Sequence, residues 1–272
     1  MADLVGVDWL DEHLENESVK LLDCTWTLPG ENTPLPAGYI PRSQYFDIDK
    51  IADLSSHMKH MLPSAQDFTN TMSEMGIKNS DHVICYDRHG IRSAPRVWWT
   101  FKTFGHRNVS ILDGGLPSWI KASKALVSDL ITPESSGEYV VKAPLIKVAN
   151  ANLVFKSMNT ENQIVDARPA GRFTGKTPEP RAGLRSGRIP GSLSFPFGQT
   201  LASDGTYLSL SNLANLVGEA GISLEHPIIT SCGSGVTAAG IAHVFYRLGA
   251  RDISLYDGSW TEWGASELPV EL

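Results

Sequence analysis

The sequence of 272 residues contains an internal repeat of about half its length. In the first copy VKLLDCTW is followed by GYIPRSQYFDI and DGGLPSW, and the second copy has NQIVDARP, GRIPGSLSFPF and DGSWTEW in the same order. Matching residues keep a nearly constant separation, with 143 residues from Asp23 to Asp166 and 144 from Trp119 to Trp263. Because solenoid repeats are only about 20–50 residues long, the sequence predicts two duplicated domains.

Each copy alternates short apolar runs with helical stretches. In the first copy the runs 83–86 and 109–112 flank a helical stretch at about 93–104, and in the second 227–231 and 253–256 flank one at about 236–248. This alternation is typical of a mostly parallel sheet with helices on both faces. We therefore predict an α/β fold with one domain at 1–124, a linker at 125–147 and a second domain at 148–272.

Composition and charge exclude several classes of protein. Hydrophobic residues make up 42% of the chain, enough for a sizeable core. Yet no apolar run reaches the roughly 18 residues needed to cross a bilayer. The formal net charge of −7 argues against a broad nucleic-acid surface. The start does not resemble a targeting peptide, and three cysteines form no disulfide framework. We expect a soluble, cytoplasmic protein that binds neither nucleic acid nor membrane.

The two copies differ most directly after a pair of matching apolar runs, 83–86 in the first copy and 227–231 in the second. The first copy continues with DRHGIR at 87–92, and the second with CGSGVT at 232–237. Backbone N–H groups in such a loop, with the start of the following helix, favour an anion and lower the pKa of a thiol. A buried, unreactive cysteine is the alternative, and we expect it for Cys24 and Cys85. The pattern favours a reactive thiol at Cys232.

Other chemistries fit this loop less well. Residues 233–238 match the dinucleotide-binding pattern G-x-G-x-x-A, and Asp257 could bind a ribose. However, the sister copy lacks these glycines and a cysteine precedes the first one. A cysteine phosphatase requires an arginine where this chain has Ala238. A dinucleotide-binding oxidoreductase and a non-catalytic binding module remain as alternatives.

A basic segment precedes the loop. Between Arg168 and Arg188 lie six basic residues and a single acid, Glu179, which gives +5 in 21 residues and leaves −12 for the rest of the chain. Several glycines and prolines indicate a loop. The segment is either a solvated surface or a carboxylate-binding site, because arginine binds carboxylates through two parallel hydrogen bonds.

The CGSGVT loop, the paired IPR/IPG and DGG/DGS motifs and the repeat resemble the two-domain sulfurtransferases of the rhodanese superfamily, and most closely their 3-mercaptopyruvate sulfurtransferase branch. The resemblance covers residues 7–268. It implies two rhodanese-like domains, the second one catalytic, with no metal and no organic cofactor. Cys232 would take sulfur from 3-mercaptopyruvate as a persulfide and release pyruvate. A thiol such as thioredoxin, or cyanide, would then accept the sulfur.

The resemblance also assigns residues to the site. Arg172 in GRF and Arg181 in EPEPR would bind the substrate carboxylate. The loop residues Gly233, Gly235, Val236 and Thr237 would complete the substrate-binding site. Thiosulfate sulfurtransferase activity is the alternative, but thiosulfate-using relatives carry Arg and Lys after the cysteine, where this chain has uncharged residues.

A proposed relay of Asp49, His60 and Ser234 would move the proton that converts the leaving enolate to pyruvate. Asp87 replaces the cysteine in the first copy, so that domain would lack thiol chemistry. Arg92 stands where the family often has an aromatic residue, and it could alter the preference for donor or acceptor.

Overall fold

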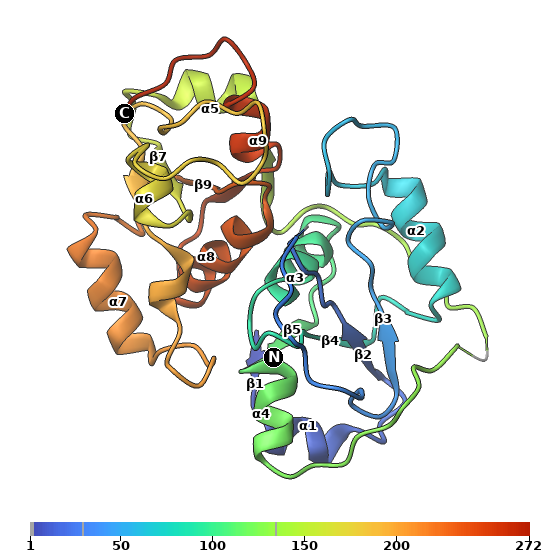
Figure 1. The fold of residues 1–272 in the computed structure, drawn as a ribbon. Helices are drawn as coiled ribbons and strands as arrows, with labels where there is room; N and C mark the ends of the chain where they lie inside the picture. The colour runs from blue at the N-terminus through green and yellow to red at the C-terminus, as the bar shows by residue number, and fades with distance from the viewer. Residues whose placement is uncertain (1–2, 29, 134) are drawn as a thin grey trace. The chain divides into compact units, whose positions relative to one another are not determined.

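The computed structural model describes residues 3–28, 30–133 and 135–272, which form two compact units (Figure 1). The described residues of the first unit lie within 1–55, 62–145 and 202–207, and those of the second within 56–61, 146–201 and 208–272. Each unit therefore includes one short segment from the other half of the sequence. These two exchanged segments, 56–61 and 202–207, are separated by 146 residues and so occupy matching positions in the repeat.

The first unit contains a five-stranded parallel sheet in the order β1-β5-β4-β2-β3. Its register places Leu21 of β2 beside Ile84 of β4, and Ile84 beside Ser110 of β5. The strands are β1 (Leu4–Val5), β2 (Val19–Asp23), β3 (Ser43–Tyr45), β4 (His82–Tyr86) and β5 (Val109–Leu112). The helices are α1 (Val7–His13), α2 (Ala65–Glu74), α3 (Ala94–Thr103) and α4 (Gly115–Lys121).

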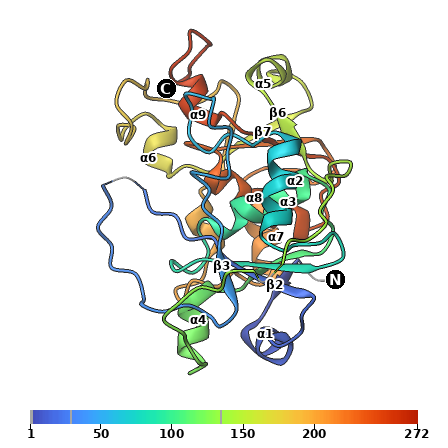
Figure 2. The same cartoon turned by 90° about the vertical axis from the view of Figure 1, so that its right-hand side faces the viewer.

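Helices cover both faces of this sheet, with α1 and α4 on one side and α2 and α3 on the other (Figure 2). Side chains alternate between the two faces along a strand. Ile84 and Tyr86 of β4 thus share one face and pack with Leu10 of α1 and Trp119 of α4. On the other face, Phe68 of α2 packs against Phe101 of α3. Apolar side chains therefore cover both faces of the sheet.

The second unit repeats this topology with a five-stranded parallel sheet in the order β6-β10-β9-β7-β8. Its strands are β6 (Lys147–Ala149), β7 (Gln163–Asp166), β8 (Leu193–Ser194), β9 (Ile228–Ser231) and β10 (Ile253–Tyr256). Its helices are α5 (Ala151–Ser157), α6 (Ala170–Phe173), the 3₁₀ helix η1 (Phe197–Thr200), α7 (Leu210–Glu219), α8 (Val236–Arg247) and α9 (Ser259–Trp263).

The repeat extends to single hydrogen bonds. Trp119 Nε1 donates to the carbonyl of Ala125 at 2.8 Å, and its counterpart Trp263 donates to the carbonyl of Pro269 at 2.7 Å, each six residues further along the chain. Both indoles are buried. Each tryptophan therefore fills a core and also holds the segment that follows its helix.

The predicted fold class is confirmed in both halves. The helices expected at about 93–104 and 236–248 are α3 and α8, and each is followed by a glycine with positive φ, Gly105 at 78° and Gly249 at 93°. Glycine adopts this left-handed conformation without steric cost, which is why it ends helices. In the described parts of the chain, no helix is long and apolar enough to cross a membrane.

Candidate active site

The CGSGVT loop leaves the carboxyl end of the central strand β9. Cys232 follows the last residue of β9 directly and is only 2% exposed. Gly235 has a φ of 77°, which turns the chain into α8 at Val236. The first amides of a helix have no partner within it. The sequence therefore folds here so that Cys232 lies four residues before the first residue of the twelve-residue helix α8.

Residues at the start of α9 bind this loop through hydrogen bonds. The Cys232 amide donates to Ser259 Oγ at 3.2 Å. The carbonyls of Cys232 and Gly233 accept hydrogen bonds from the Trp260 and Thr261 amides, both at 2.9 Å. Because these bonds fix the loop backbone at its first two residues, the direction of the Cys232 side chain is set by α9 as well as by β9.

The first copy shows how the equivalent loop holds an anion. Asp87 is fully buried, and its Oδ2 accepts hydrogen bonds from the amides of Arg92, Ser93 and Ala94 at 2.7, 2.8 and 2.9 Å. Its Oδ1 accepts another from the His89 amide at 3.0 Å. In the repeat, Cys232 is the counterpart of Asp87, and Gly90 has a positive φ like Gly235. The loop architecture is thus suited to negative charge at this position.

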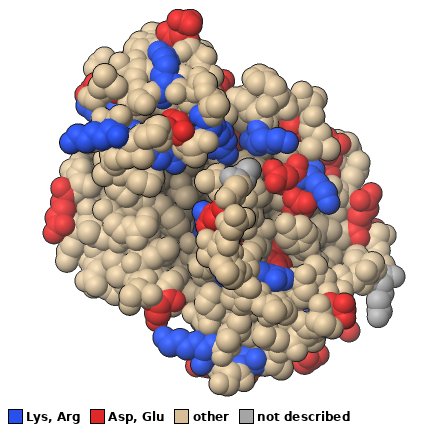
Figure 3. Space-filling model, viewed as in Figure 1, with Lys and Arg blue, Asp and Glu red and all other residues tan. Residues whose placement is uncertain are grey.

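Two of the predicted site residues lie against this loop. A Cβ atom added to Gly233 would lie 2.9 Å from Arg172 Nη2 and 3.7 Å from Arg181 Nη1. Both arginines come from the basic segment. Figure 3 shows several Lys and Arg side chains gathered on the upper part of the face of the second unit in this view. The structure therefore brings two guanidinium groups to the residue next to Cys232, as the carboxylate-binding interpretation requires.

A buried ionic network supports Arg172. Glu179 accepts hydrogen bonds from Arg172 Nε at 3.2 Å and from Arg168 Nη1 at 2.8 Å. Arg168 Nη2 in turn donates to Asp166 Oδ2 at 2.6 Å. Burial alone would lower the pKa of Arg168, but the two carboxylates raise it above its ordinary value. Sequence reasoning missed Arg168 and Glu179 as parts of the site, although a lone acid among six basic residues was a usable signal.

The last two arginines of the basic segment, Arg185 and Arg188, bind the C-terminal part of the chain. Arg185 donates to the carbonyls of Trp263, Gly264 and Leu268. Arg188 pairs with Glu271. These bonds hold the last residues of the chain against the basic segment.

The residues of the predicted relay fall in two units. Ser234 is buried in the loop, and His60 is 4% exposed in the segment 56–61, which belongs to the second unit. Asp49 belongs to the first unit and accepts a hydrogen bond from Trp26 Nε1 at 3.1 Å. The other predicted loop residues, Val236 and Thr237, form the first turn of α8.

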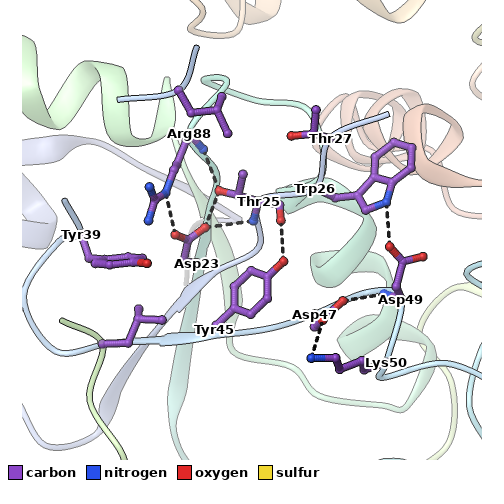
Figure 4. Close-up of a pocket in the computed structure, with 12 residues that line it drawn as sticks. Asp23, Thr25, Trp26, Thr27, Tyr39, Tyr45, Asp47, Asp49, Lys50 and Arg88 are labelled. Atoms are coloured by element: carbon purple, nitrogen blue, oxygen red, sulfur yellow. Dashed lines mark hydrogen bonds and ion pairs between the residues drawn. The ribbon is translucent and has the colours of Figure 1, made fainter. Parts of the chain in front are cut away.

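Asp49 lines a cavity of about 510 Å³ in the first unit (Figure 4). The cavity lies where β2, β3 and β4 end, as ligand sites of parallel sheets do. Its two basic groups already have partners. Arg88 Nε donates to Asp23 at 3.1 Å and its guanidinium stacks on the Tyr39 ring at 4.2 Å, while Lys50 pairs with Asp47 at 3.4 Å. Cys24 and Cys85 are fully buried, as predicted.

Arg92, the departure from the family pattern, has a local partner. Its guanidinium pairs with Glu31 at 2.8 Å. The hydrogen bond from Arg92 lowers the pKa of Glu31 to about 2. Arg92 is thereby held within the first unit.

A search for metal-binding groups covered the described residues. Among them, no cluster of three or more His, Cys, Asp or Glu side chains could hold a metal ion.

The Rhodanese-like domain model matches residues 6–122 and again residues 151–266. The chain belongs to the rhodanese family. The two matches cover the two copies of the repeat, so the resemblance drawn from the loop and the paired motifs is confirmed. This rhodanese-family assignment replaces the dinucleotide-binding alternative.

Relatives match over nearly the whole chain. The thiosulfate/3-mercaptopyruvate sulfurtransferase 1, mitochondrial, of Arabidopsis thaliana is 40% identical and is matched over 98% of this chain and 78% of the relative. The 3-mercaptopyruvate sulfurtransferase of Escherichia coli K12 is 39% identical over 98% of this chain and 97% of the relative. The crystal structure of E. coli SseA, a 3-mercaptopyruvate sulfotransferase with a rhodanese fold, superposes with a TM-score of 0.84 at 35% identity and covers 96% of this chain and 99% of that one.

Proposed function

We propose that this rhodanese-family protein is a sulfurtransferase that takes sulfur from 3-mercaptopyruvate through a persulfide on Cys232. In this proposal residues 148–272 form the catalytic domain and residues 1–124 a non-catalytic one. The observation that carries it is the convergence of Arg172 and Arg181 on Gly233, next to the thiol. The E. coli 3-mercaptopyruvate sulfurtransferase, matched over 97% of its own length, supports this donor, and the name of the Arabidopsis relative includes both 3-mercaptopyruvate and thiosulfate.

The reaction follows from the groups at the loop. The Cys232 thiolate attacks the sulfur of 3-mercaptopyruvate, an S–S bond forms and the C–S bond breaks. The electron pair of that bond stays on carbon as the enolate of pyruvate, which takes up a proton. An acceptor thiolate then attacks the outer sulfur of the persulfide and regenerates the Cys232 thiolate. The loop amides favour negative charge on the sulfur in both steps.

The charge of the site favours a carboxylate donor. Arg172 and Arg181 can bind the single carboxylate of 3-mercaptopyruvate with paired hydrogen bonds. Thiosulfate is a dianion, and the loop carries no cation at Gly233 or Ser234. Thiosulfate sulfurtransferase activity is therefore the second candidate function.

A donor comparison tests the proposed function. We expect kcat/KM for 3-mercaptopyruvate to exceed that for thiosulfate by at least about tenfold, which corresponds to about 1.4 kcal/mol. The measurement is initial rates with cyanide as common acceptor for both donors. A preference for thiosulfate would instead assign the chain to the second candidate function.

The proposal also includes the relay of Asp49, His60 and Ser234. A buried histidine such as His60 can act as the general acid that protonates the enolate. Asp49 would orient the imidazole, as carboxylates do in related relays. His60 and Ser234 belong to the same compact unit, which supports this role.

Steady-state kinetics separate binding from proton transfer. Arg172→Lys and Arg181→Lys should each raise KM for 3-mercaptopyruvate by about 10–100-fold, because an ammonium group cannot bind a carboxylate through two parallel bonds. His60→Asn should lower kcat by about 100-fold instead. The matched control is the exposed Arg251→Lys. An unchanged KM in both arginine variants contradicts the proposal that Arg172 and Arg181 bind the donor carboxylate. An unchanged kcat in His60→Asn contradicts the relay.

Two further parts of the proposal concern the setting of the reaction. We propose a reduced thiol, with thioredoxin as the protein example, as the acceptor in the cytoplasm. Competition between thioredoxin and small thiols for the persulfide tests the acceptor, and cell fractionation tests the location. The Arabidopsis relative is named as mitochondrial, so a mitochondrial signal would overturn the cytoplasmic assignment.

A further inference from the structure

Glu179 binds one particular edge of Arg172. Its carboxylate accepts hydrogen bonds from Nε at 3.2 Å and from Nη2, while its side chain is only 2% exposed. A guanidinium offers two edges to carboxylates, one made of Nε and Nη2 and one of Nη1 and Nη2. With the first edge held by Glu179, Nη1 and the second hydrogen of Nη2 form the edge that can bind another carboxylate, and Nη2 lies 2.9 Å from the position of a Cβ added to Gly233.

Glu179 is itself fixed to the sheet. Arg168 donates to it at 2.8 Å and to Asp166, the last residue of β7, at 2.6 Å. The Arg168 side chain is 0% exposed, lies 4.2 Å from the Trp260 ring and also donates to the carbonyl of Gly187 at 2.8 Å. The orientation of Arg172 thus depends on a chain of buried ionic contacts that begins at β7.

The same contacts set the charge of the cluster. Arg168 and Arg172 pair with the carboxylates of Asp166 and Glu179, and Arg181 lies near Arg172 at Gly233, so these five side chains together carry a net charge of +1. That charge complements a donor with a single carboxylate. Without Glu179 the cluster would carry +2, which complements a dianion.

We propose that Glu179 is a positioning and specificity-determining residue, which orients Arg172 toward the Cys232 loop and favours a monoanionic over a dianionic sulfur donor. This role rests on the proposed function, because it takes Arg172 and Arg181 as the group that binds the donor. It explains why the site would select a donor with one negative charge over a donor with two.

Two substitutions separate charge from shape. Glu179→Gln removes the charge but keeps the side-chain length, so the ratio of kcat/KM for 3-mercaptopyruvate to that for thiosulfate should fall at least about tenfold. Glu179→Asp keeps the charge but is one methylene shorter. It should lower kcat/KM for both donors by similar factors and leave their ratio within about twofold. The matched control is Glu271→Gln, which removes a carboxylate from the half-exposed pair with Arg188.

Each outcome bears on the proposal. Equal losses for both donors in Glu179→Gln would overturn the specificity role and leave a structural one. If that variant does not fold, as judged by its melting temperature, a changed donor ratio in Glu179→Asp would overturn the proposal by itself. A wild-type protein without activity toward 3-mercaptopyruvate contradicts the proposed function instead. In that case Glu179→Gln must still raise kcat/KM for thiosulfate, and a failure to do so overturns the role of Glu179.

Discussion

Replacement of Cys232 by serine is expected to lower pyruvate release from 3-mercaptopyruvate by at least about a thousandfold, because the hydroxyl of serine is a far weaker nucleophile than a thiolate and cannot carry a persulfide. The variant should keep the native fold, since serine is close in size to cysteine and the site is held mainly by backbone bonds to α9. Pyruvate release and the mass of one added sulfur atom after exposure to donor are the two measurements.

The other two cysteines provide the controls for this experiment. Burial raises the pKa of the Cys24 thiol well above its ordinary value, and the neighbouring Cys85 raises it further. Neutral, buried thiols are unreactive. Cys24→Ala and Cys85→Ala should therefore retain near-wild-type turnover per folded molecule. Near-wild-type turnover in Cys232→Ser, or sulfur found on Cys24, would refute the assignment of the nucleophile.

Replacement of Asp87 by alanine is expected to destabilise the first unit by about 3–5 kcal/mol, because it leaves buried amide donors without an acceptor. Four backbone N–H groups depend on this one carboxylate. Asp87→Asn should cost less, since the carboxamide oxygen still accepts hydrogen bonds. Hydrogen exchange at the amides of Ser93 and Ala94 reports the local change, and a urea titration of the full chain reports the global one.

Asp129→Ala is the matched control for Asp87→Ala, because Asp129 is exposed. Surface substitutions of this kind usually change stability by no more than about 0.5 kcal/mol. A loss below about 1 kcal/mol in Asp87→Ala would show that the loop of the first unit does not depend on its internal anion.

The features that the sequence predicted correctly are those written in local patterns. Apolar runs and helix-ending glycines such as Gly105 and Gly249 mark the elements of both sheets. Short motifs pointed to Arg172 and Arg181, which the structure places near Gly233, and their role in binding the donor stays a prediction. The contacts of Glu179 are not visible in such a pattern, because they join side chains across a loop, and the sequence shows only that it is the single acid among six basic residues. Asp49 and His60 show the same limit, since they are eleven residues apart yet belong to different units.

The repeated topology of the two units has a consequence for how each half can change. Two copies of one domain in a single chain correspond to the two identical subunits of a homodimer. In a homodimer every substitution appears twice, so both copies must keep the same loop. Once the subunits share one gene, each copy can change alone. One half could then place Asp87 in its loop, while the other kept Cys232 and still included the segment that carries His60.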